Sequence, residues 1–492
     1  MLTVSVKLLF LVLLFLGSEF CLFSSSAEKQ CYNVLFVAFD DLRPDLSCYG
    51  DPVAITPNFD SLAAQGTLFN KAYCQLAVCG PSRLSLITGL RPDTIKVWDL
   101  KTHFRENLPE LVTLPQYFKN HGYHSQAIGK ILHGSSVSMY DPPSWTEDPL
   151  FDYGRPHHWR YASPENLAVE AHKRSATEGV DVPDDTFVDG LVCMAAEEAI
   201  DRFAKSQKPF FLGVGFRKPH LPFVAPKKYW DLYDRDSIPA RTSTKHPKGA
   251  PEYATRTWNE IEGYTDIPKQ LDRISEEKIS ELRHGYYACI SYVDALLGRL
   301  LDKLEERDLA NDTIVCLWGD HGFHLGEQGL WTKANNYELS ARVPLILSVP
   351  NQKQKGTVSN AFVELVDLYP TLTEACGLGI PDGLEGLSMT PLLDKPYRSW
   401  KTAAFNQYPR DYTKIKHEKH GDVMGYSIRT DRYRYVEWRD WESSKVLHQE
   451  LYDHSTDPHE TINQAGIEEM ASALSRHQEI LRDGWQGALP KN

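Results

Sequence analysis

The sequence lacks an excess of positive charge. Its 492 residues include 53 Lys and Arg against 66 Asp and Glu, which gives a formal net charge of −13. Because binding to a phosphate backbone needs a basic surface, nucleic acid is not an expected partner. The negative net charge does not exclude a polyanionic substrate, since a local cationic pocket can lie within an acidic protein. We expect such recognition to be confined to a small cationic cluster, because no long basic stripe is visible.

The sequence also lacks an apolar run long enough to span a bilayer. The run Leu8–Leu16 is too short for this, follows Lys7 and precedes the small residues Ser24-Ser25-Ser26-Ala27. This pattern predicts that residues 1–27 are a signal peptide. We therefore expect an exported protein without a membrane span, periplasmic or secreted, or lysosomal if the source is eukaryotic.

Paired cysteine motifs are missing as well. The eight cysteines after residue 27 are scattered, with no CxxC pair and no zinc-finger spacing. In a large exported protein this distribution predicts one or two disulfides together with buried thiols.

Apolar segments alternate with helical patterns along most of the chain. The helical patterns include 60–65, 114–120, 185–205 and 276–306, and the predicted strands are 33–39, 125–128, 209–216, 313–318 and 344–349. This alternation predicts an α/β fold with a large, mostly parallel or mixed sheet flanked by helices. We assign it to a catalytic domain of residues 28–395. Short alternating strands and a helix at 467–481 predict a smaller C-terminal antiparallel sheet-plus-helix domain, residues 396–492.

Polar residues follow four of the predicted strands. The ends of parallel strands share one edge of a sheet, so we expect these residues to converge there. Each has a plainer interpretation: an acid that caps a turn, a core histidine or a solvated lysine. The residues are Asp40, Asp41, Lys130, His133, His220, Asp320 and His321.

The three acids are hard oxygen donors. Asp40, Asp41 and Asp320 suit Ca²⁺ or Mg²⁺ better than zinc. His321 lies either at the rim of the metal site or forms a hydrogen bond to a bound anion. The alternative is an acid pair at a turn. Two adjacent carboxylates repel each other unless something neutralises them, which favours a metal.

The most specific motif is Cys79-Gly80-Pro81-Ser82-Arg83. Pro81 suits the first turn of a helix and Gly89 its end, so Cys79 is predicted at a helix N-terminus, where free N–H groups favour anions. A buried structural thiol and a nucleophilic thiolate are the alternatives that the residues alone leave open.

This motif, followed by Thr88-Gly89, resembles the signature of the formylglycine-dependent sulfatases of the alkaline-phosphatase superfamily. The resemblance extends over nearly the whole mature chain and is closest to the iduronate-2-sulfatase branch. The other matching stretches are Asp40–Pro44, Gly129-Lys130, Lys218–Phe223, Asp320–Gly322, Trp331–Lys333 and Met424–Thr430. The resemblance implies an alkaline-phosphatase-like fold and oxidation of Cys79 to formylglycine (3-oxoalanine) by a formylglycine-generating enzyme.

The resemblance also implies the role of each site residue. One hydroxyl of the formylglycine hydrate attacks sulfur and releases the sugar alcohol, and the second hydroxyl then expels sulfate. Arg83, Lys130 and Lys333 supply positive charge, His133 orients or deprotonates the hydrate, and His220 protonates the leaving oxygen. One Ca²⁺ is implied, with the ligands Asp40, Asp41, Cys79, Asp320 and His321.

The implied substrate is a sulfated carbohydrate. A terminal 2-O-sulfated uronate of a glycosaminoglycan, or of an algal polysaccharide such as ulvan, would be hydrolysed in an exo-acting manner. Aromatic residues between 135 and 184 either stack on a sugar or only hold that segment in place; these are Trp145, His157, His158 and Trp159. A phosphate or phosphonate ester hydrolase and a non-catalytic carbohydrate-binding relic are the alternatives.

Overall fold

The structure is a computed structural model in which Cys31–Asn492 form one compact unit. It describes residues 31–134, 136–150, 160–170, 173–206, 208–255, 260–410 and 422–491. The predicted signal peptide and the residues His157, His158 and Trp159 lie outside the described residues.

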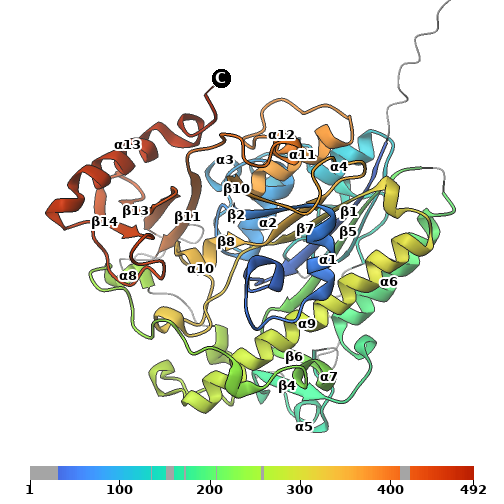
Figure 1. Ribbon diagram of the computed structural model, residues 1–492, viewed down its shortest axis with the longest axis horizontal. Coiled ribbons are helices and arrows are strands. Elements are labelled where there is room, and N and C mark those ends of the chain that lie inside the picture. Colours follow the sequence, from blue (N-terminus) through green and yellow to red (C-terminus); the bar gives the residue numbers. More distant parts are fainter. Residues whose placement is uncertain are drawn as a thin grey trace, which may run out of the picture. The chain divides into compact units, whose positions relative to one another are not determined.

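A large mixed sheet forms the centre of the fold (Figure 1). Parallel pairs join β1 to β5 and β7, β3 to β5, and β10 to β2, whereas β9 is antiparallel to both of its neighbours. The strand order is β10 (Thr357–Glu364), β2 (Thr67–Tyr73), β9 (Leu345–Ser348), β7 (Thr313–Gly319), β1 (Asn33–Asp40), β5 (Phe210–Pro219) and β3 (His124–Gly129), with the short β8 (Arg342–Val343) paired to β2.

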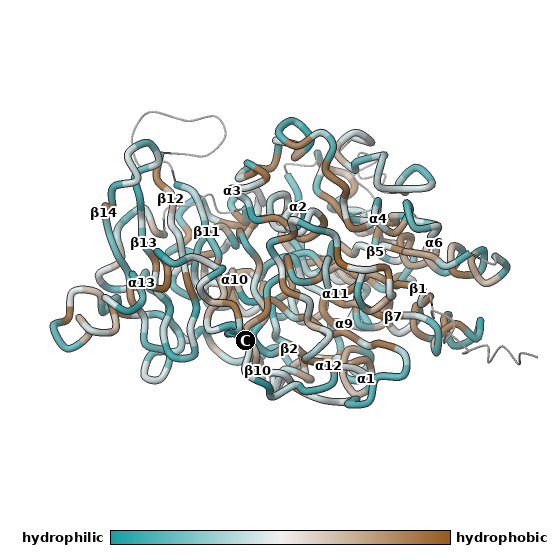
Figure 2. The backbone as a smooth tube through the Cα atoms, turned by 90° about the horizontal axis from the view of Figure 1, so that it is seen from above, coloured by the Kyte–Doolittle hydropathy of each residue, from teal (hydrophilic) through white to brown (hydrophobic). Residues whose placement is uncertain are grey.

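Helices cover both faces of this sheet, which is why its strands are apolar on both sides. In β1, Leu35, Val37 and Phe39 belong to one core. Val34, Phe36 and Ala38 belong to the other core. The helices of the first core are α1 (Pro57–Gln65), α6 (Val188–Phe203) and α9 (Glu276–Glu306), and those of the second are α2 (Cys79–Thr88), α4 (Leu114–Asn120), α11 (Leu368–Ala375) and α12 (Thr390–Asp394). In Figure 2 the hydrophobic colour gathers on the central strands.

A four-stranded antiparallel sheet follows in the C-terminal part. Its strands are β11 (Ala404–Arg410), β12 (Val423–Arg429), β13 (Tyr433–Asp440) and β14 (Val446–Asp453). Helix α13 (Ala471–Gly487) packs on it through Leu474, Ile480 and Leu481. The predicted fold class is confirmed, while the domain boundary at 395/396 stays a prediction.

Short elements complete the fold. The segment 135–184, which we expected to be irregular, contains helix α5 (Pro164–Leu167) and strand β4 (Thr177–Val180), which pairs with β6 (Phe223–Pro226). The remaining short helices are α3 (Pro92–Ile95), α7 (Lys227–Trp230), α8 (Glu252–Thr255) and α10 (Glu338–Ala341).

The predicted disulfides are absent from the described residues. Cys48, Cys74, Cys79, Cys193, Cys289, Cys316 and Cys376 are free thiols. Most of them are buried on separate elements of the two cores, where a thiol packs as a small apolar side chain. In the part of the chain that the structure describes, no helix is long and apolar enough to cross a membrane.

Candidate active site

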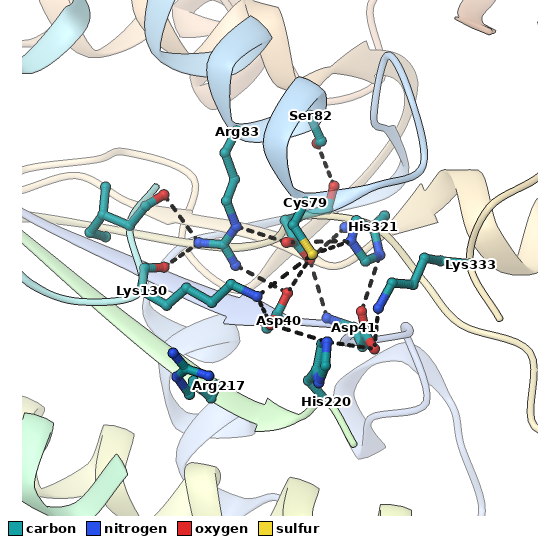
Figure 3. A network of polar contacts seen from close by, with 12 residues as sticks. Asp40, Asp41, Cys79, Ser82, Arg83, Lys130, Arg217, His220, His321 and Lys333 are labelled. Carbon is teal, nitrogen blue, oxygen red and sulfur yellow. Dashed lines mark hydrogen bonds and ion pairs between the residues drawn. The ribbon is translucent and has the colours of Figure 1, made fainter. Parts of the chain in front are cut away.

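Four strand ends of the central sheet bring the predicted polar residues together (Figure 3). Asp40 is the last residue of β1, and Asp320 directly follows β7. Lys130 follows β3, and His220 follows β5. Asp41 has a positive φ of 62°, a left-handed conformation that Asp tolerates better than most residues. This turn lets the adjacent carboxylates of Asp40 and Asp41 both reach the site.

Cys79 is the first residue of α2 and lies at the centre of the cluster. The helix ends at Thr88, and Gly89 adopts a left-handed conformation, as the motif predicts. The Cys79 Sγ atom lies 3.2 Å from Oδ1 of Asp40 and 3.3 Å from Nε2 of His321. Nζ of Lys130 is 3.6 Å from the same sulfur. Only 2% of Cys79 is exposed, so its neighbours, rather than solvent, decide its chemistry.

Arg83 fixes the geometry of the cluster from one turn further along α2. Its guanidinium is fully buried, and Nε donates to Oδ2 of Asp320 at 2.8 Å. Nη1 donates to the carbonyl oxygens of Lys130 and Ile131. Nη2 lies 3.5 Å from Oδ1 of Asp40. Arg83 therefore connects α2 with the ends of three strands.

The donor set fits a hard divalent cation. One ligand atom from each of Asp40, Cys79, Asp320 and His321 lies within 4.8 Å of the others. Oδ1 of Asp41 is buried and accepts no hydrogen bond from any residue that the structure describes. Carboxylate oxygens that converge in this way, one of them without a donor, are what Ca²⁺ or Mg²⁺ requires.

The electrostatics of the two adjacent aspartates differ. Burial would raise the pKa of Asp40, but Lys130, His220 and Arg83 hold it well below the usual range. Burial raises the pKa of Asp41 well above that range, and the charge of Asp40 adds to the effect. His321 is buried as well, yet Asp320 and Cys79 raise its pKa to about 9.

Lys333 and His220 contact the two adjacent aspartates of the cluster. Nζ of Lys333 lies 3.1 Å from Oδ2 of Asp41. Nδ1 of His220 lies 2.7 Å from the carbonyl oxygen of Leu221, so Nδ1 carries a hydrogen and Nε2 faces the site. Nε2 is 3.9 Å from Oδ2 of Asp40 and 4.0 Å from Oδ2 of Asp41. Burial, together with the charges of Lys333 and Lys130, lowers the pKa of His220 to about 3.

Glu260 is a further residue of the cluster, and neither a motif nor a strand end in the sequence predicts it. Its carboxylate lies 2.9 Å from Nζ of Lys333 and 3.3 Å from Nε2 of His220. Although burial opposes ionisation, His220 and Lys333 lower the pKa of Glu260 to about 2. Glu260 stands in a polar stretch without periodicity or motif, so no signal in the sequence distinguished it.

Two other expected site residues differ in their surroundings. His133 lies near the cluster, and burial with the charge of Lys130 lowers its pKa to about 3. Its Nδ1 is buried and has no hydrogen-bond partner among the described residues.

Trp145 is only 2% exposed and donates to the carbonyl oxygen of Tyr140 at 2.7 Å. It packs in the second core, so it holds its segment in place and does not stack on a sugar.

Comparison with known proteins identifies the family of this site. Residues 32–378 match the profile of the sulfatase family, and residues 326–484 match the C-terminal profile of N-sulphoglucosamine sulphohydrolase. The chain belongs to the sulfatase family. This sulfatase is 33% identical to human iduronate 2-sulfatase, in an alignment that covers 86% of this chain and 87% of the relative. It is 31% identical to a sulfatase of Formosa agariphila, with 91% of this chain and 86% of the relative covered.

Solved structures share the fold of this sulfatase. A phosphonate monoester hydrolase from Silicibacter pomeroyi superposes with a TM-score of 0.75 at 21% identity, over 93% of this chain and 96% of the other. At that identity the likeness concerns the fold alone. The family match shows that the chain is a sulfuric ester hydrolase. The two alternative functions, a phosphonate ester hydrolase and a non-catalytic carbohydrate-binding relic, are therefore not favoured.

Proposed function

We propose that this sulfatase hydrolyses an O-sulfate ester of a uronate-containing carbohydrate with Cys79 converted to formylglycine. The observation that carries the proposal is the position of Cys79 at the start of α2. Its Sγ lies within 3.6 Å of Asp40, Lys130 and His321, and it is one helical turn before Arg83. The aldehyde hydrate supplies an oxygen nucleophile for sulfur, which a buried thiol in this surrounding would not provide.

We propose that Asp40, Asp41, Asp320, His321 and residue 79 hold one Ca²⁺. When bound, the ion supplies positive charge to a sulfate oxygen and to the oxygens of residue 79. Lys130 and Lys333 flank this position from opposite sides, so their ammonium groups neutralise the remaining sulfate oxygens. Arg83 orients Asp320 and Asp40 through its buried contacts and is a positioning residue in this geometry.

The two histidines have separate tasks in this proposal. Nε2 of His220 faces the cluster from the β5 side, because its Nδ1 donates to the Leu221 carbonyl. In its imidazolium form, which the carboxylate of Glu260 at 3.3 Å stabilises, Nε2 gives a proton to the leaving oxygen. His133 has a low pKa and a buried Nδ1 without a partner, so its neutral ring can accept a proton from the hydrate. Acid and base thus act from different strand ends.

A pair of arginines beside the cluster supports a uronate as the substrate. Arg160, Arg217 and His220 line the same small cavity, and Figure 3 shows Arg217 beside Lys130. Burial, and after it the positive charge of Arg217, lowers the pKa of Arg160, and both arginines line this cavity. Neighbouring guanidinium groups are a favourable site for a carboxylate. We propose that they bind the carboxylate of a terminal 2-O-sulfated uronate, as in glycosaminoglycans or ulvan.

The test is sulfate release from a panel of sulfated disaccharides. The enzyme should act on a non-reducing-end 2-O-sulfated uronate, and the Arg217→Ala variant should raise KM about tenfold, as expected for the loss of a charge-assisted hydrogen bond of about 1.5 kcal/mol. A substrate whose carboxylate is reduced to an alcohol should show no such difference. The exposed Arg307→Ala serves as the matched control. Equal activity on carboxylate-free sugars, or release from the interior of intact polymer, would refute the exo-acting uronate assignment.

Maturation and location form the remaining part of the proposal. A formylglycine-generating enzyme is the partner that would modify Cys79 while the chain is unfolded, because Cys79 is 2% exposed in the folded protein. We propose export to the periplasm or the medium, or delivery to the lysosome in a eukaryotic source. The sulfated carbohydrate would be encountered in those compartments.

A further inference from the structure

A cavity of about 1110 Å³ is separate from the active site. It lies along the edge strand β10, between the chain segment 396–402, the β12–β13 turn and α13, and we call it the C-terminal groove. None of the active-site residues lines it. Strand β10 is four strand intervals from β1, and at about 4.8 Å each this places the groove roughly 20 Å from the catalytic strand.

Cations dominate the lining of the C-terminal groove. Some of them are neutralised, since Lys71 pairs with Asp431 at 2.6 Å and Arg432 pairs with Asp453. Arg398, Arg476 and Lys491 also line it, and the ion pairs found among the described residues involve none of these three. In a chain of net charge −13, three cations without an acidic partner in one concave surface create a local positive field.

An exposed aromatic side chain stands beside these cations. Tyr397 is 80% exposed, although tyrosine usually packs much of its ring against other groups. The guanidinium of Arg398 lies 5.6 Å from the ring centroid of Trp400, which is itself nearly buried in the wall. An exposed aromatic ring beside guanidinium groups combines a face for a sugar ring with donors for an anionic oxygen.

We propose that the C-terminal groove is a non-catalytic binding site for a sulfated polysaccharide. The assignment of a carbohydrate rests on the proposed function, because the same polymer would carry the terminal residue that the active site hydrolyses. The volume exceeds the roughly 300–1,000 Å³ of most small-molecule pockets, so it suits a stretch of polymer rather than a single sugar. The groove contains no set of nucleophile, base and metal ligands, so it binds and does not hydrolyse.

Binding and turnover are measured separately to test this. Heparin is titrated into the full chain carrying Cys79→Ala, so that no sulfate is removed, by calorimetry at low and at physiological salt. Replacement of Arg398, Arg476 and Lys491 by alanine should weaken binding by about tenfold or more, since three charge-assisted contacts are lost. A control with the exposed Lys208, Lys353 and Lys355 replaced by alanine removes the same charge and should change the affinity by less than about twofold.

Activity gives the second readout. With Cys79 intact, the groove variant should lose kcat/KM on intact polymer but keep it on a sulfated disaccharide, and Tyr397→Ala should show a weaker form of the same pattern. Equal heparin affinity of the Arg398, Arg476 and Lys491 variant and of the lysine control variant would overturn the proposal. Duplex DNA that binds as tightly as heparin, and that also needs these three cations, would overturn it as well. If groove-dependent heparin binding is found but no carbohydrate sulfate is released, the proposed function fails and the groove stands. If sulfate is released but heparin binds equally well with and without the three groove cations, the proposed function stands and the groove proposal fails.

Discussion

The carboxylate of Glu260 lies 3.3 Å from Nε2 of His220. The same carboxylate accepts a hydrogen bond from Nζ of Lys333 at 2.9 Å, so one acid orients two of the groups proposed to act on the substrate. Glu260 comes from a polar segment before α9, far in sequence from either partner. In the arrangement proposed above, Glu260 lies on the side of the leaving oxygen, next to His220.

Replacement of Glu260 by glutamine should lower kcat/KM for the sulfated substrate by about 10- to 100-fold, the usual cost of removing an orienting partner. The amide keeps the size of the side chain but no longer attracts the cations. The exposed Glu276→Gln, which loses only a surface ion pair with Arg241, is the control. Wild-type kinetics in the Glu260 variant would show that His220 and Lys333 are positioned without it.

Removal of the divalent cation should lower activity and melting temperature together. A ligand that binds only the folded state adds about 2.7 kcal/mol of stability at one hundred times its Kd, and EDTA removes that contribution. Ca²⁺ should restore both quantities in the wild type and in the exposed control Asp236→Asn, but not in Asp41→Asn. Metal analysis that finds zinc, with neither calcium nor magnesium, would contradict the proposed ligand set.

The sequence predicts most of the active site because the fold turns separate motifs into neighbours. Asp40, Asp320, His220 and Lys130 are expected at one rim only because they follow strands of one sheet, and the structure places them there. Strong apolar runs such as β1 and β7 made those strands visible. Glu260 carried no such signal, since its contacts arise from the path of a loop.

Other parts of the fold were missed for physical reasons. Strand β10 mixes polar and apolar residues because it lies at the sheet edge, where Val358 and Asn360 are exposed. Its neighbour β2 carries the half-buried polar residues Asn70 and Lys71. The antiparallel direction of β9 is set by its partners, and the run of apolar residues does not encode it. Trp145 is as aromatic as a sugar-binding residue would be, and only its burial decides between the two interpretations.

A buried ion cluster between the central sheet and the C-terminal part should contribute to acid stability. Glu364 of β10 pairs with Arg91 through two contacts of 2.8 Å and with Lys401 at 2.8 Å. Glu364→Gln should lower the free energy of unfolding by about 3 kcal/mol, because it leaves the buried guanidinium of Arg91 without its carboxylate, while Lys401 keeps its ion pair with Asp367 at 2.7 Å. Asp431→Asn breaks only the pair with Lys71 at an 83% exposed carboxylate and should cause no comparable change.

The same carboxylate sets a pH dependence. Burial would raise the pKa of Glu364, but Arg91 and Lys401 lower it from 4.5 to about 2. A carboxylate with a lowered folded pKa contributes its full stability above pH 4.5 and loses it as the pH falls toward 2. Between these values the wild type should lose up to about 1.4 kcal/mol per pH unit more than Glu364→Gln. Denaturant unfolding at pH 7, 4.5 and 3.5 measures this, and parallel pH curves for the two proteins would refute the assignment.

The state of residue 79 tests the account most directly. Trypsin cleaves after Lys71 and Arg83, so one peptide, residues 72–83, carries both Cys74 and Cys79. In active protein that is denatured and alkylated, we predict that Cys74 carries the alkyl group. At position 79 we predict an aldehyde, formed by replacement of the sulfur by oxygen with the loss of two hydrogens. A peptide from fully active protein in which both cysteines are alkylated thiols would contradict the central claim.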